Sequence, residues 1–376
     1  MSTLLLKFVV WLENYNLPDV VCPHGLLFHR WLPDGKKDAI ILDTGDSNAK
    51  LKVWFERYGY VDNGYIKFDY ERREVDPNII PKQAILDGGP LFGELEIQGL
   101  SEEELEALRE NKIGSEAYVR LGKRIVKRVI YPTIRRFIDI LRTNYGQYWV
   151  KNIEPWDSRK GSLGYYCNSI LQLKWSLDGG RTWRPFIPNE IKIGPITLTI
   201  LEDFTSYLTE KDWKELEKVF NGGYEPSLAC LLISRAHALL NQGNLKYAFI
   251  EGVSALEIAL SEFIKRNAPQ LPDPLVNYLK LHFRKMPIKA RLMIVATASG
   301  KIPTEDLEKA IKAIDIRHDI VHEGRDPPAD SKEMVRALLN AAAALVTGPK
   351  FRFLNANPGN VIKPVEEWEK ESQRYT

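Results

Sequence analysis

The pattern that most restricts how this chain folds is the helical spacing of apolar residues from Thr209 onward. Apolar side chains recur about every three to four positions there, which is typical of amphipathic helices. Pro226 marks the start of one helix, and Gly324 stands where a left-handed C-cap is expected. Short loops between such helices predict an antiparallel bundle. The expected helices are 226–242, 245–263, 274–283, 288–298, 303–322 and 330–345.

The residues before Thr209 show a different pattern, in which short β-type runs alternate with turn signals such as Pro-Asp-Gly. Ser101 and Glu104 form a capping box for one interrupting helix, and a second periodic segment runs from 116 to 145. We therefore expect an α+β N-terminal domain. The candidate strands are 4–12, 26–31, 39–42, 51–55, 65–70, 95–97, 148–153, 169–175, 182–186 and 196–201.

The composition adds three limits. The net charge is +2 over 376 residues, so a basic surface must be local rather than global. The 3 cysteines are widely separated, which fits neither a disulfide framework nor a zinc spacing and suits a reducing cytoplasm. No stretch approaches the roughly 20 apolar residues that span a bilayer, so we expect a soluble, cytoplasmic protein with no membrane partner.

One helix of the expected bundle carries charged residues where apolar ones are predicted. Arg317 and His318 occupy its core stripe, and a cation on a packing seam is costly unless it is paired or faces a cavity or partner. His322 follows one turn later, so the three side chains can line one groove. Local violations of this kind are typical of functional sites. The apolar members of the predicted stripe are Leu307, Ala310/Ile311, Ile314 and Val321.

Two segments together resemble the HEPN superfamily (higher eukaryotes and prokaryotes nucleotide-binding), particularly its branch in bacterial defence proteins of the ApeA type. The first is the helix with Ala248-x7-Leu256-Glu257, and the second is Arg317-His-Asp-Ile-Val-His322-Glu-Gly. The resemblance covers roughly 209–348 and implies an all-α antiparallel helical bundle there. It leaves an α+β domain at 1–208, with a sensing or targeting role, and an extended C-terminal arm at 349–376.

The resemblance implies a metal-independent endoribonuclease that acts as a homodimer, with the Arg and the terminal His of each subunit forming a composite site. It also implies a toxin or antiviral defence effector, with a cognate antitoxin or defence-system partner. The residue after the Arg is most often Asn in this family, and here it is His318. No cofactor and no metal are expected. The implied site consists of catalytic Arg317, His322 and His318, supported by Glu257, which would orient Arg317, and Asp319.

The residues suit this chemistry, because RNA carries its own nucleophile, the 2′-hydroxyl. A histidine can accept or donate a proton near neutral pH, and an arginine can clamp a phosphate and stabilise the charge that develops on it. Two alternatives stay open. The Arg and His can tie helices together in a non-catalytic RNA- or protein-binding module. His318 and His322, spaced as in His-Glu-x-x-His zincins, can instead bind zinc in a hydrolase, although no persuasive third ligand follows.

The segment 116–145 is rich in basic residues, with apolar side chains predicted on its opposite face. A solvated face is the ordinary interpretation of such a helix, and a track for the RNA backbone is the functional one, because phosphate contacts need only clustered cations. The candidate RNA-binding residues are Arg120, Lys123, Arg124, Lys127 and Arg128.

The run from Ser176 to Trp183 resembles an Asp-box, a β-hairpin turn in which an Asp accepts backbone N–H groups and glycines adopt positive φ. A single copy indicates structure rather than glycosidase activity.

Overall fold

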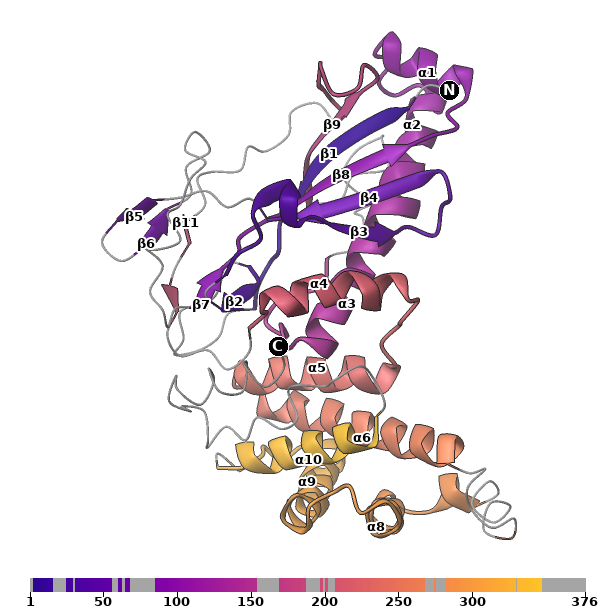
Figure 1. Cartoon of the computed structure of the whole chain (residues 1–376). Coiled ribbons are helices and arrows are strands. Elements are labelled where there is room, and N and C mark those ends of the chain that lie inside the picture. Colours follow the sequence, from indigo (N-terminus) through magenta and orange to yellow (C-terminus); the bar gives the residue numbers. More distant parts are fainter. Residues whose placement is uncertain are drawn as a thin grey trace. The chain divides into compact units, whose positions relative to one another are not determined.

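A computed structural model describes residues 3–15, 25–29, 31–55, 60–62, 65–67, 85–153, 169–186, 197–198, 200–201, 207–267, 274, 282–328 and 330–346. The chain divides into two compact units, each described by itself below (Figure 1). An antiparallel sheet comes first along the chain and a region of several helices follows, as expected. The first unit comprises Met1–Asn14, Val21–Ile140 and Val150–Glu225, and the second comprises Tyr15–Val20, Leu141–Trp149 and Pro226–Thr376.

The first unit is built on a six-stranded antiparallel sheet with the order β10-β9-β1-β8-β4-β3. Alternate residues of β1 are buried, including Leu4, Leu6 and Phe8, as a sheet covered on one face requires. Phe8 lies over its cross-strand partner Gly93, where a Cβ would come within 2.3 Å of its ring. The strands are β1 Leu4–Val10, β3 Ile40–Asp43, β4 Ala49–Trp54, β8 Leu91–Ile97, β9 Ile170–Ser176 and β10 Arg184–Pro185.

Two smaller antiparallel sheets have the orders β12-β7-β2 and β11-β6-β5. The strand expected at 148–153 does not form. Val150 makes only an isolated bridge to Asn14, because the chain pairs there with the short segment after β1 rather than with a strand. The smaller sheets comprise β2 Leu27–His29, β5 Tyr60–Asp62, β6 Tyr65–Lys67, β7 Ile85–Asp87, β11 Thr197–Leu198 and β12 Ile200–Leu201, and a 3-10 turn covers Gly35–Asp38.

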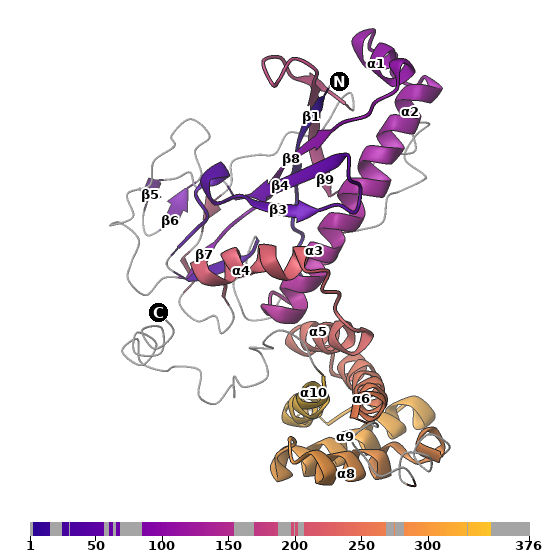
Figure 2. The ribbon, with the colours of Figure 1, turned by 45° about the vertical axis from the view of Figure 1, so that its right-hand side comes forward.

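The long helix expected at 116–145 forms, but not as one uniform α-helix. It consists of α2 (Glu116–Lys123), a π-helical segment (Arg124–Ile130) and α3 (Tyr131–Asn144). Figure 2 shows it running alongside the sheet of the first unit, to which residues up to Ile140 belong. Before it lies α1 (Glu102–Arg109), which begins with the predicted capping box.

Helix α4 (Glu210–Asn221) belongs to the first unit, although its helical pattern groups it with the C-terminal helices. Its Trp213 is buried, donates a hydrogen bond from Nε1 to the Asp38 carbonyl at 2.7 Å, and packs edge-on against Phe28 and Phe55. These contacts explain why the division between the units falls after Glu225 rather than before Thr209.

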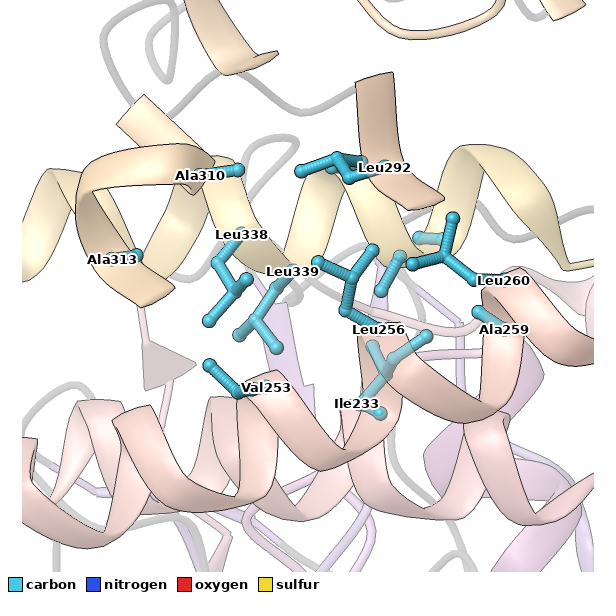
Figure 3. Close-up of a cluster of buried hydrophobic side chains, with 14 of the residues drawn as sticks. Ile233, Val253, Leu256, Ala259, Leu260, Leu292, Ala310, Ala313, Leu338 and Leu339 are labelled. Carbon is cyan, nitrogen blue, oxygen red and sulfur yellow. The ribbon is translucent and has the colours of Figure 1, made fainter. Parts of the chain in front are cut away.

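The second unit contains helices that share one apolar core (Figure 3). Helices α6 and α10 approach closely at Gly252, where a Cβ would lie 2.9 Å from a methyl of buried Leu338. The expected helix 274–283 and the C-terminal arm fall largely or wholly outside the described residues. The helices are α5 Leu228–Asn241, α6 Leu245–Asn267, α8 Ile288–Ser299, α9 Thr304–Glu323 and α10 Lys332–Leu345, with a 3-10 turn at Phe283–Lys285.

The Asp-box turn forms between β9 and β10, as predicted. The Asp178 carboxylate accepts the backbone N–H groups of Arg181 and Thr182, at 3.0 Å each, and the hydroxyl of Ser176 at 2.6 Å. Hydrogen bonds from Ser176 and Thr182 hold the pKa of the Asp178 carboxyl below its ordinary value. The turn therefore has a structural role.

Candidate functional site

The predicted Arg and His residues lie on the last turns of α9, which ends at Gly324 in the left-handed conformation, with φ of 69°. The buried side chains of this helix are Ala310, Ala313, Ile314 and Ile320. Val321, predicted in the stripe, is instead 44% exposed. The buried stripe of α9 passes through Ile320 rather than Val321. Ile314 and Ile320 each lie three residues from position 317, and residues three apart share one face of a helix.

Arg317 therefore remains on the buried side of α9, between Ile314 and Ile320. Its side chain is half-buried, and its Nε is buried with no hydrogen-bond partner in the part of the chain that the structure describes. No carboxylate pairs with it among those residues. A charge on a packed face without a compensating carboxylate is unfavourable, so the position of Arg317 is not explained by packing.

His318 and His322 lie on the exposed side of the same turns. Their ring centroids are 4.5 Å apart, with 42° between the ring planes. Both residues are exposed. Because Arg317 is adjacent to His318 in the sequence, α9 places a guanidinium and two imidazoles within its last two turns. The predicted catalytic residues are thus brought together, although only Arg317 lies on the packed face.

The two supporting carboxylates have other partners. Asp319 pairs with Arg325 at 3.9 Å, and Arg325 also pairs with Glu323 at 2.7 Å. These three charges therefore form ion pairs at the C-terminal end of α9. Glu257 does not orient Arg317 as expected. Its carboxylate pairs with Arg291 of α8, whose side chain is buried. Sequence reasoning missed Arg291, because α8 is apolar around most of its circumference and gives no sign of which face it buries.

The candidate RNA-binding residues lie along α2 and the π-helical segment and differ in their surroundings. Arg120 pairs with Glu103 at 2.9 Å, and half-buried Arg124 approaches Asp46 at 3.4 Å. The hydrogen bond that Arg120 donates to the Glu103 carboxylate raises the pKa of Arg120. The other three candidates, Lys123, Lys127 and Arg128, are exposed.

The histidine of α5 contrasts with the exposed pair. His237 is packed against Tyr148, with ring centroids 5.8 Å apart. Burial, with a contribution from the positive charge of Arg336, lowers the pKa of His237 to about 4. This imidazole is neutral at physiological pH.

Metal binding at the His pair lacks further support. Among the described residues, no group of three or more His, Cys, Asp or Glu side chains lies where it could hold a metal ion. In the same residues, no helix is both long enough and apolar enough to cross a membrane.

Comparison with known proteins adds no assignment, since no protein-family model, no curated protein and no solved structure matches this chain.

Proposed function

We propose that this protein is a metal-independent endoribonuclease with a HEPN-like helical bundle, acting as a toxin or antiviral defence effector. One observation carries the proposal: Arg317 stands half-buried on the packed side of α9 with no carboxylate partner among the described residues, next to an exposed pair of histidines. A structural arginine is expected to have a carboxylate partner. An arginine that serves a phosphodiester is expected to keep its hydrogen-bond donors available.

The proposed reaction uses the 2′-hydroxyl of RNA as the nucleophile. His322 of one subunit accepts the hydroxyl proton as the 2′-oxygen bonds to phosphorus. The terminal histidine of the second subunit donates a proton to the departing 5′-oxygen. Arg317 stabilises the extra negative charge on the phosphate oxygens during this exchange. The products are a 2′,3′-cyclic phosphate and a 5′-hydroxyl end. No divalent ion takes part.

The direct test compares RNA cleavage by the wild type, His322→Ala and Lys312→Ala. Lys312 is an exposed cation on the same helix and serves as the matched control. We expect His322→Ala to reduce cleavage by about 10²-fold or more and Lys312→Ala to change it little. Activity should persist in excess EDTA. Equal cleavage by all three proteins refutes the catalytic assignment, and activity that requires added zinc favours a metal hydrolase.

A homodimer is part of the proposal, because each subunit contributes a single Arg317 and a single terminal His322, whereas two subunits supply both a proton acceptor and a proton donor. Three large apolar side chains of the neighbouring helices, Met293, Ile294 and Val321, are exposed, and a second copy of the chain would cover such residues. The test mixes subunits of wild type and His322→Ala. Heterodimers far less than half as active as the wild type support one site built by two chains. Activity proportional to the wild-type chains, or a cleaving monomer, refutes it.

A non-catalytic RNA-binding protein is the second candidate, favoured by the exposed cations of α2 and the π-helical segment. It predicts that wild type and His322→Ala bind RNA equally and that neither cleaves it.

A further inference from the structure

The helical segment formed by α2, the π-helical turns and α3 has two sharply different sides. Between residues 120 and 135, its buried positions are almost all apolar, and they include Val126, Ile130 and Ile134. Its exposed positions are almost all basic. They are Arg120, Lys123, Lys127, Arg128, Pro132 and Arg135.

The π-helical segment reduces the rotation of these two sides around the helix axis. The buried residues Val126, Ile130, Ile134 and Ile138 recur every four positions. In a uniform α-helix of 3.6 residues per turn, that spacing would rotate the apolar stripe by about 40° at each step. The wider turns of the π-helix rotate the stripe the other way over the step from Val126 to Ile130, which offsets part of the drift that follows in α3. The exposed cations on the opposite side are therefore aligned as well, over roughly 18 Å from Lys123 to Arg135 at about 1.5 Å per residue.

Much of this charge is not compensated within the protein. Arg120 pairs with Glu103, which removes it from the set. Lys123, Arg128 and Arg135 make no ion pair with any residue that the structure describes. Aligned like charges without counter-charges repel one another, and a polyanion relieves that repulsion.

We propose that this basic stripe, defined by Lys123, Lys127, Arg128 and Arg135, binds the phosphate backbone of a single-stranded nucleic acid. The choice of RNA rests on the proposed function. A membrane surface fits less well, because interfacial helices expose apolar residues for insertion and this stripe exposes Pro132 alone between its cations. Phosphate contacts require only aligned positive charges, without specific recognition of bases.

The test measures binding of a fluorescently labelled single-stranded RNA by anisotropy at several KCl concentrations, in the full chain carrying His322→Ala so that the probe stays intact. The stripe variant combines Lys123→Gln, Arg128→Gln and Arg135→Gln. Its matched control combines Lys211→Gln, Lys214→Gln and Lys218→Gln, which removes three exposed cations from α4 of the same unit.

We expect the stripe variant to bind at least about tenfold more weakly at low salt. The slope of log K against log[KCl] should fall by about 2 for three lost single-strand contacts. The α4 control should keep the parent slope. An unchanged slope in the stripe variant, or an equal loss in the control, overturns the proposal.

Two further arms separate the possible ligands. DNA of the same sequence that binds more tightly than RNA overturns RNA as the ligand. The nucleic-acid proposal is overturned if the stripe variant loses binding to phosphatidylserine vesicles but binds RNA as tightly as the parent does. Binding and cleavage are measured separately. If the protein binds RNA through the basic stripe but does not cleave it, the proposed ribonuclease function is refuted and RNA binding by the stripe is still supported.

Discussion

Two arginines of the helical unit illustrate how differently the same side chain is placed. Arg291 of α8 is 5% exposed and is paired with Glu257 of α6. Arg317 of α9 is half-buried, and no carboxylate neutralises it among the described residues. The Nε of each is buried without a hydrogen-bond partner, so the difference between them is the carboxylate.

This comparison separates a structural charge from a candidate catalytic one. A buried charge persists in a fold when a partner compensates it. Glu257 provides that compensation for Arg291 and ties α6 to α8. Arg317 lies beside an exposed His pair instead, and the compensation it lacks is what a bound phosphate would supply.

The largest expected effect is on cleavage by Arg317→Ala. We expect a loss of at least about 10²-fold, because the phosphate loses its charge stabilisation, with little change in the free energy of unfolding. The measurement is the rate of RNA cleavage per folded molecule, with folding checked by circular dichroism. A variant that is destabilised but cleaves RNA at the wild-type rate per folded molecule would make Arg317 a structural residue like Arg291.

The next effect is on stability, through Glu257→Ala. This change leaves the Arg291 charge buried without its partner, and we expect a loss of about 3 kcal/mol in the free energy of unfolding. Urea denaturation measures it. Glu308→Ala, which removes an exposed carboxylate from α9, is the control and should lie within about 0.5 kcal/mol of the wild type. Similar values for both variants would remove the structural role of the Arg291–Glu257 pair.

A third, smaller effect concerns pH. The pKa of His237 is about 4 in the folded protein and about 6.5 for an unperturbed histidine. Between these values the unfolded chain binds a proton that the folded chain does not, so stability is full above pH 6.5 and falls as the pH drops toward 4. The loss at pH 5 is about 2 kcal/mol. His237→Phe should show a correspondingly smaller loss between pH 7.5 and 5, and identical losses would contradict the assignment.

The smallest expected effect comes from Arg291→Met. The remaining carboxylate of Glu257 has a half-exposed side chain, so water solvates it once its partner is gone. We expect a change below about 1 kcal/mol, much less than for Glu257→Ala. Cleavage per folded molecule should match the wild type. A loss as large as that of Glu257→Ala would mean that the guanidinium itself, rather than its unpaired charge, decides the stability.

Local signals in the sequence were reliable where one short stretch contains every atom involved. The capping box of Ser101 and Glu104 forms as predicted, and so do the Asp178 turn and the left-handed Gly324 at the end of α9. The last helix begins later than the expected residue 330, because α10 begins at Lys332 after Ser331, without a side-chain cap.

The spacing of apolar residues predicted the long helix after Glu116 but not its π-helical turns. The four-residue recurrence of Val126, Ile130 and Ile134 fits the apolar stripe of an ordinary amphipathic α-helix, so the spacing gave no signal for the π-helical turns. Helix α4 shows the converse limit. Its pattern predicted a helix, while only the packing of Trp213 against the first unit assigns it to that unit.

The sequence by itself determined that a helical region follows a region of strands and helices, and that Arg317, His318 and His322 share the end of one helix, because these features depend on neighbours along the chain. Only the tertiary structure decided that Glu257 pairs with Arg291, that Val321 is exposed while Ile320 is buried, and that Arg120 and Arg124 face carboxylates. Pairing and burial depend on which elements meet in space, and the spacing of residues within one helix carries no information about its partner.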